Sequence, residues 1–187
     1  MRSRQILAMA AACAALAAAC PGRAQEIRLG VGYAPHGPET SASMVVDYVF
    51  ESPKALKFAA MPRPYVGVQV SLGGDTDFAQ AGLLWRKVRG RGYLDLGAGL
   101  AVHNGALSLP HPKAGVSDAE NQRRRRDLKE KIEFESRVQF HATFALGLRL
   151  DEHWAVELEG QHWSNGRFAS DTHDGADSLG LRTAYRF

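Results

Sequence analysis

Three side chains near the C-terminal end have the types and spacing that ester hydrolysis needs: His162, Ser164 and Asp177. A histidine and a serine two residues apart in a strand point to the same face, so a base and a hydroxyl nucleophile emerge side by side. Adjacent strands lie about 4.8 Å apart, so a carboxylate that begins the next strand could reach the imidazole and fix its tautomer. The three residues share otherwise apolar faces, which suggests a hydrolase whose substrate lies in a membrane.

Asn165 directly follows the serine and offers a side-chain amide or a backbone N–H to a developing oxyanion. The competing interpretation is that His162, Trp163 and Ser164 belong to the interfacial girdle of an inactive barrel, where aromatic and polar residues gather. His173 lies in the same connection and is an alternative base. No pair of histidines has metal-ligand spacing beside a set of carboxylates, so neither a metal nor another cofactor is expected.

The segments that carry these residues alternate between apolar and polar side chains, and six earlier segments do the same. The expected strands are Glu26–Tyr33, Met44–Phe50, Tyr65–Leu72, Thr76–Arg86, Gly92–His103, Glu135–Leu150, Trp154–Trp163 and Asp177–Phe187. No stretch between them has a helical period. The pattern predicts an all-β fold, an eight-stranded antiparallel transmembrane β-barrel, because closure leaves no unpaired strand edge in hydrocarbon.

The polar face of these strands supplies a filling for such a barrel. Its side chains, which could pair inside, are Asp47, Gln80, Asp95, Gln139, His141, Arg149, Glu157, Glu159, Arg182 and Arg186. A soluble lipocalin-like barrel would show the same alternation turned inside out. The chain ends Thr183-Ala184-Tyr185-Arg186-Phe187, which resembles the terminal aromatic signature of bacterial outer-membrane barrels and favours the membrane form.

The first 24 residues have the pattern of a secretory signal peptide: a basic start, an apolar run and the exit Gly22-Arg23-Ala24. Cleavage after Ala24 leaves a barrel domain of residues 25–187 and removes both cysteines, Cys13 and Cys20, which excludes thiol chemistry. A lipoprotein site at Cys20 is the minor alternative. The segment holds three of the 23 basic residues and none of the 20 acidic ones, so the mature chain has 20 of each and no case for nucleic-acid binding.

The run His162-Trp163-Ser164-Asn165-Gly166, an Asp174-Gly175 turn and an acid ten residues before the end resemble the PagL-type outer-membrane lipid A 3-O-deacylases, an acyloxyacyl hydrolase family. Members carry a histidine, any residue, then Ser-Asn, with an acid a dozen or so positions later in the final strand. That acid is typically glutamate, whereas this chain has aspartate after a slightly longer loop. Weaker similarity covers Tyr93–Gly105 and Phe140–Leu150.

The resemblance implies an eight-stranded barrel whose triad faces the outer leaflet, with His162 as base, Ser164 as nucleophile, Asp177 as orienting acid and Asn165 at the oxyanion. The implied reaction is metal-independent hydrolysis of the 3-hydroxyacyl ester at position 3 of lipid A, through an acyl-serine. The implied partner is lipopolysaccharide in the outer membrane of a Gram-negative bacterium, and a homodimer is left open. The rivals are a non-enzymatic structural or adhesive barrel, a phospholipase-like or acyl-transfer barrel, and a lipocalin-like binder.

With both chain ends on the periplasmic side, the connections after strands one, three, five and seven face the exterior. The longest, Asn104–Phe134, is expected to be an external loop. A charge run within it is usually solvated, but its guanidinium groups could hold lipopolysaccharide phosphates at headgroup level: Arg123, Arg124, Arg125 and Arg126. On the other side, the link Glu51–Arg63 is longer than a periplasmic turn and predicts a short surface segment or longer strands.

Overall fold

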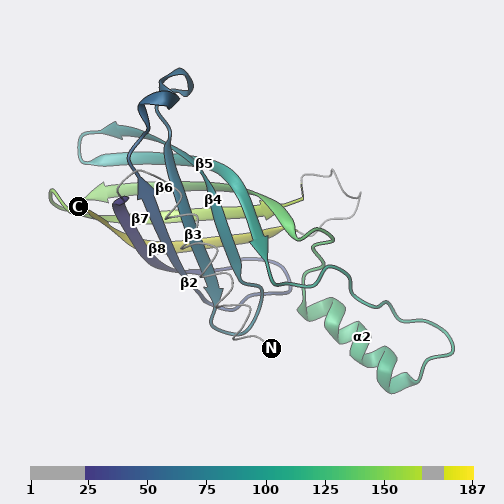
Figure 1. The fold of residues 1–187 in the computed structure, drawn as a ribbon. Coiled ribbons are helices and arrows are strands. Elements are labelled where there is room, and N and C mark those ends of the chain that lie inside the picture. The colour runs from purple at the N-terminus through teal and green to yellow at the C-terminus, as the bar shows by residue number, and fades with distance from the viewer. Residues whose placement is uncertain (1–23, 166–174) are drawn as a thin grey trace.

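Eight antiparallel strands close into one barrel in the computed structural model, which describes residues 24–165 and 175–187 (Figure 1). Each strand pairs with its neighbours in the chain, and the last returns to the first. The strands are β1 (Ala24–Tyr33), β2 (Ser43–Phe50), β3 (Arg63–Ser71), β4 (Phe78–Arg89), β5 (Gly92–His103), β6 (Val138–Arg149), β7 (Trp154–Ser164) and β8 (Ala176–Arg186). The predicted eight-stranded barrel is confirmed. Of the predicted signal peptide, residues 1–23 lie outside the described residues.

The outer wall of the barrel is apolar and its lumen is polar. Large apolar side chains stay exposed along the wall, among them Leu29, Val31, Leu96, Leu146, Leu148, Leu158 and Leu181. The residues between them point inward and are buried, as the period of two requires. A lipocalin-like barrel needs the reverse arrangement, so that alternative is wrong.

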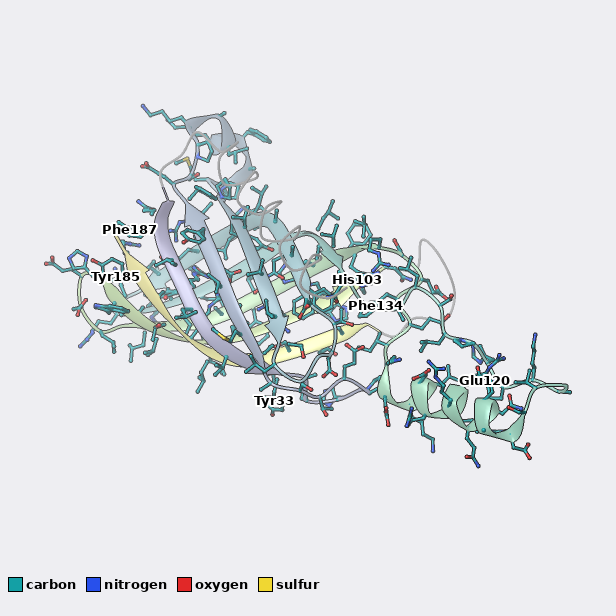
Figure 2. All side chains as sticks on the ribbon, turned by 60° about the horizontal axis from the view of Figure 1, so that its bottom comes forward. Tyr33, His103, Glu120, Phe134, Tyr185 and Phe187 are labelled. Atoms are coloured by element: carbon teal, nitrogen blue, oxygen red, sulfur yellow. The ribbon has the colours of Figure 1, made fainter. Side chains whose placement is uncertain are left out.

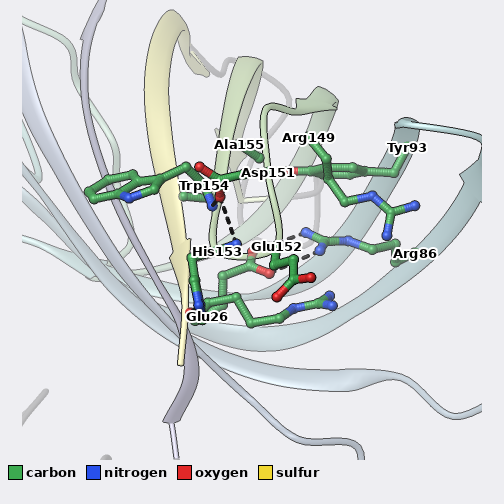
Figure 3. Close-up of a pocket in the computed structure, with 11 residues that line it drawn as sticks. Glu26, Arg86, Tyr93, Arg149, Asp151, Glu152, His153, Trp154 and Ala155 are labelled. Carbon is green, nitrogen blue, oxygen red and sulfur yellow. Dashed lines mark hydrogen bonds and ion pairs between the residues drawn. The ribbon is translucent and has the colours of Figure 1, made fainter.

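Two arginines bind the same pair of carboxylates at one end of the lumen. Arg28 donates to Glu26 Oε1 and Asp95 Oδ2, each at 2.6 Å. Arg86 donates to Asp95 at 2.6 and 2.7 Å. It also donates to Glu26 at 2.9 and 3.0 Å, and its guanidinium lies 3.9 Å from the ring centroid of Tyr93; Figure 3 shows these three side chains. The space left beside Glu26, Arg86 and Tyr93 is about 20 Å³, room for a single water molecule. The described side chains therefore fill this end of the lumen.

A third arginine gathers the acids further along the lumen. Arg182 donates to Glu157 and Glu159 on β7 and to Asp47 Oδ2 on β2 at 2.7 Å. Each of these groups is almost completely buried, which is tolerable because each charge meets an opposite one. The network joins β8 to β7 and, across the lumen, to β2.

Eight of the ten predicted interior residues are buried: Asp47, Gln80, Asp95, Gln139, His141, Glu157, Glu159 and Arg182. The other two, Arg149 and Arg186, are half-buried and lie at the last residues of their strands, where the lumen opens. Arg149 instead donates to the carbonyl oxygen of Gly90 in the β4–β5 turn, at 2.6 Å. The prediction that Arg149 pairs inside is therefore wrong, because the end of its strand projects beyond the packed layers.

The two ends of the barrel differ in their connections. The turn end has the two-residue β4–β5 turn, in which Gly90 adopts the left-handed φ of 60° that favours glycine, and the β6–β7 turn. It also has the β2–β3 connection, which forms a 3-10 helix, η1 (Lys54–Ala59), and so confirms the predicted short surface segment. The loop end has the β1–β2, β3–β4 and β5–β6 connections, the last of which is the longest in the described residues. Figure 1 shows η1 and the helix α2 projecting from opposite ends.

The β5–β6 connection contains an α-helix, α2 (Asp118–Glu130), where the sequence predicts only loop. Ser117 caps it by accepting a hydrogen bond from the backbone N–H of Glu120, and the Ser117-x-x-Glu120 spacing matches the capping-box sequence pattern. The helix buries no residue, so it has no apolar stripe for a periodicity search to find. None of the helices in the described residues has the length and hydropathy of a membrane-spanning helix.

Replacing Arg182 by alanine is expected to destabilise the barrel by about 3–5 kcal/mol, because three buried carboxylates lose their partner. The free energy of unfolding from urea titration in detergent micelles, followed by tryptophan fluorescence, measures this. Arg89→Ala, which removes an exposed arginine at the turn end, is the matched control and leaves the midpoint unchanged. Equal midpoints for both variants would contradict the role given to the lumen network.

Candidate active site

His162 and Asp177 form a hydrogen-bonded pair on the outer wall near the loop end. They are direct partners in the β7–β8 register, and His162 Nδ1 lies 2.8 Å from Asp177 Oδ1. Their side chains are 50 % and 47 % exposed, so both are accessible from outside the barrel. Because the aspartate engages Nδ1, the ring keeps Nε2 for a second partner. The shorter aspartate thus still reaches the imidazole.

Ser164 is the last residue of β7 and lies two residues beyond His162 on the same side of the strand. It is half-buried and pairs in register with Phe140 of β6. Within the described residues no hydrogen bond joins its hydroxyl to the His162 ring. Catalytic hydrogen bonds are often long before substrate binds, so the arrangement remains compatible with a hydroxyl that is activated by this imidazole.

Asn165 ends the first described range and Gly175 begins the second, and the two residues differ in environment. Asn165 is buried, unlike the half-buried Ser164 before it. Gly175 lies against the imidazole edge: a Cβ atom built on it would lie 2.9 Å from His162 Cε1 and 3.0 Å from the Trp163 carbonyl oxygen. Glycine is thus the residue that fits beside this ring. Gly166 and the predicted alternative base His173 lie outside the described residues.

Trp163, between the histidine and the serine, fixes the end of β7 from inside the lumen. It is completely buried and stacks between Phe78, at 4.3 Å between ring centroids, and His141, at 5.2 Å. Its Nε1 donates to Gln80 Oε1 at 3.3 Å. Because side chains alternate across a strand, holding Trp163 inside directs His162 and Ser164 outward. Sequence reasoning took Trp163 only as a girdle residue and missed this role.

The β5–β6 connection covers Trp163 at the loop end of the lumen. Ile132 and Phe134 are buried in one cluster with Phe78 and Trp163, and the Phe78 and Phe134 rings meet edge to face at 5.7 Å. Figure 2 shows Phe134 beside His103 where the connection enters the barrel, with their ring centroids 4.1 Å apart. The β5–β6 connection thereby packs behind the strand that carries the histidine and the serine.

An open groove of about 560 Å³ adjoins the His162–Asp177 pair on the outer wall. Phe144, Gly160 and Leu179 line it on the turn-end side of the pair. Pro35 and His36 of the β1–β2 connection line it at the loop end. The Phe144 ring covers Gly160, where any side chain would collide with it. The groove is mostly apolar and can accept a hydrocarbon chain next to the imidazole.

The four predicted headgroup arginines all lie on α2, which projects beyond the barrel (Figure 2). Consecutive helical residues are about 100° apart, so their side chains point around the helix and form no single patch. Arg124 donates to Glu120 and to the His111 carbonyl oxygen, and Arg126 lies 4.0 Å from Glu130. None of the four, Arg123, Arg124, Arg125 or Arg126, lines the groove beside His162.

One group of acids in the described residues is close enough to share a metal ion: Glu26, Asp95 and Glu157, with ligand atoms within 4.8 Å of one another. Arg28 and Arg86 already neutralise Glu26 and Asp95, and Arg182 pairs with Glu157. A cation there would have to displace three guanidinium groups. The group lies in the packed lumen and its side chains do not line the outer groove at His162.

Solved barrels share this architecture at low sequence identity. The crystal structure of the outer membrane enzyme PagL superposes with a TM-score of 0.60 and 12 % identity, covering 87 % of this chain and 99 % of that one. A de novo designed transmembrane β-barrel gives 0.52 and 12 %, covering 88 % and 96 %, and Neisserial surface protein A gives 0.51 and 10 %, covering 87 % and 94 %. At such identities the likeness establishes the fold. No curated protein matches the chain by sequence.

A protein-family model matches the sequence of this chain. The model for lipid A 3-O-deacylase (PagL) matches residues 65–186, which is most of the chain and includes the strands that carry His162, Ser164 and Asp177. The match agrees with the resemblance in the His162–Asn165 run, and a barrel with an apolar outer wall is the fold that such an enzyme needs. The chain belongs to the lipid A 3-O-deacylase (PagL) family and is a lipid A deacylase.

Proposed function

We propose that the protein is an outer-membrane serine hydrolase that removes the ester-linked 3-hydroxyacyl chain at position 3 of lipid A. The observation that carries the proposal is the 2.8 Å contact between His162 Nδ1 and Asp177 Oδ1, on a wall that faces lipid, with Ser164 next on the same side of the strand. The loop end faces the exterior in this proposal, so the site meets the outer leaflet, where lipopolysaccharide lies.

In the first step, Ser164 Oγ attacks the ester carbonyl carbon while His162 Nε2 takes the hydroxyl proton. Asp177 holds the ring in the required tautomer and stabilises the imidazolium that forms. Asn165 contributes to oxyanion binding through the backbone N–H that follows the nucleophile or through its amide. The bond to the sugar oxygen breaks, and that oxygen receives the proton from His162.

In the second step, water attacks the acyl-serine with His162 again as base, and the 3-hydroxy fatty acid leaves. The groove along Phe144, Gly160 and Leu179 supports this proposal, since it could hold the acyl chain while the ester stays at the interface. Binding of the remaining lipid positions the ester against the serine. We propose that these side chains suffice without a metal ion.

The family assignment does not favour the non-enzymatic structural or adhesive barrel. A phospholipase-like or acyl-transfer barrel differs in which lipid loses mass and in whether calcium is needed. We propose the α2 arginines as a second contact: Arg123 and Arg125 have no ion pair within the described residues, so their guanidinium groups are available to bind phosphate groups.

Ser164→Ala is expected to abolish deacylation, because the variant lacks the hydroxyl that accepts the acyl chain from lipid A. Mass spectrometry of lipid A from cells that produce each protein checks this: only the wild type lowers the mass by one 3-hydroxyacyl chain. Thr183→Ala, an outer-wall hydroxyl elsewhere on β8, retains activity, as does the wild type in EDTA. Loss of a phospholipid acyl chain instead would support the phospholipase rival.

Asp177→Asn is expected to lower kcat by roughly a hundred- to ten-thousandfold with little change in KM, because the amide no longer stabilises the imidazolium and can favour the wrong tautomer. Single-turnover hydrolysis in detergent micelles measures the acylation rate directly. Asp177→Glu restores the carboxylate and recovers much of the rate. If the asparagine variant hydrolyses at the wild-type rate, Asp177 is not the orienting acid.

Gly175→Ala is expected to lower kcat by about a hundredfold, since the added methyl displaces the His162 ring from its position between Asp177 and the serine. Initial rates on lipid A give kcat, and the urea midpoint checks that the barrel is intact. Gly92→Ala is the matched control, because its Cβ meets only ordinary contacts at 3.5 Å and beyond. Unchanged activity in Gly175→Ala would mean that the ring has room to move.

A further inference from the structure

A second cavity, of about 550 Å³, opens at the loop end of the barrel and is not used by the proposed chemistry. Three connections line it, β1–β2, β3–β4 and β5–β6, together with the end of α2. Its walls are mainly polar side chains: Glu39, Thr40, Ser41, Asp75, Thr76, Asn104, Glu130 and Lys131. We call it the loop cleft. Its size falls in the range of small-molecule sites, and its polarity sets it apart from the apolar groove at His162.

Hydrogen bonds between the connections build the walls of the loop cleft. Glu39 accepts from the backbone N–H of Thr76 at 2.9 Å and of Ile132 at 3.2 Å, so one carboxylate ties all three connections together. Asp75 Oδ2 accepts from the backbone N–H of Ser41 at 2.9 Å. Asn104 Nδ2 donates to Asp77 Oδ2 at 2.7 Å. The cleft is therefore formed in advance of any ligand, which lowers the entropic cost of binding.

The charge of the loop cleft indicates which class of ligand it can bind. Within the described residues Glu39 and Asp75 have no cationic partner, and the Lys131 ammonium is held by Asp127 at 2.9 Å. An anionic phosphate would be repelled by these carboxylates. Hydroxyl groups would donate to them, because each carboxylate retains acceptor sites beyond its backbone hydrogen bonds. Neutral sugar hydroxyls are therefore the favoured ligand.

The loop cleft lies next to the candidate active site along the chain. The β1–β2 connection lines the groove with Pro35 and His36 and the cleft with Pro38 through Ser41. His36 and Glu39 are three residues apart, which limits their separation to about 11 Å. A lipid whose acyl chain lies in the groove and whose sugars extend outward from the membrane would bring those sugars to the cleft.

We infer that the loop cleft binds the neutral saccharide portion of lipopolysaccharide, beyond the lipid A disaccharide, and orients the glycolipid for deacylation. The inference rests on the proposed function for the acyl-chain groove and adds a separate sugar site to it. The saccharide donates hydroxyl hydrogen bonds to Glu39 and Asp75 and receives them from Thr40. The cleft raises affinity for glycosylated substrate and takes no part in bond cleavage.

Thr40 and Asp75 provide the test. Thr40 is exposed and makes no hydrogen bond within the described residues, so Thr40→Trp fills the cleft without breaking its walls. Asp75→Asn keeps an oxygen for the Ser41 N–H and removes the charge. KM is measured for each on lipopolysaccharide with core sugars and on lipid A without them. Gln122→Trp, on an exposed position of α2 outside the cleft, is the matched control.

Both cleft variants are expected to raise KM about tenfold on the sugar-bearing substrate, the cost of one or two hydrogen bonds, and to leave kinetics on sugar-free lipid A unchanged. An unchanged KM for both substrates, or an equal rise for both, would overturn the inference. Direct binding separates it from the proposed chemistry: core oligosaccharide without lipid is titrated into the Ser164→Ala protein in micelles. If the oligosaccharide binds and Thr40→Trp abolishes that binding, the sugar site is supported even if Ser164 is not the nucleophile. If the oligosaccharide does not bind to the intact cleft, the inference is contradicted.

Discussion

The pairing of buried arginines with buried carboxylates is the interaction on which the rest of the barrel depends. A small closed barrel that faces lipid must place its polar residues in the lumen, where an unpaired charge is costly. Arg28 and Arg86 share Glu26 and Asp95, and Arg182 joins three further acids from β2 and β7. Once these ions are matched, strand register is fixed, because slipping one strand by a residue would turn its charges toward lipid.

The strand register in turn determines which side chains of β7 lie on the outer wall. The ion network and the Phe78–Trp163–His141 stack both hold β7 by its inward side chains. Because side chains alternate along a strand, the remaining side chains of β7 must point outward, and His162 lies opposite Asp177 on β8. The site thus needs no dedicated scaffold on the lipid side. Its geometry is a by-product of how the lumen packs, with only Gly175 shaping the space around the ring.

Much of this follows from sequence because a strand has the simple period of two. All eight strands, the apolar wall and the His162–Asp177 pair could be predicted in that way. The partners within the lumen could not: Arg28 and Asp95 are 67 residues apart, and their contact depends on the stagger of strands around the ring. Helix α2 was not predicted because its sequence is polar on every side, although the spacing of Ser117 and Glu120 matches the capping-box pattern and could have revealed its start. The loop cleft is assembled from three connections and has no local signature.

The alternation of β7 also has an evolutionary consequence. Inserting or deleting one residue between Trp154 and Trp163 would rotate Trp163 out to the lipid and carry His162 and Ser164 into the lumen, losing packing and site in a single event. Helix α2 has no such coupling, since it buries nothing and can lengthen or shorten by whole turns. Length change in descendants of this gene is therefore expected to collect in the projecting helix, while the seventh strand keeps its residue count.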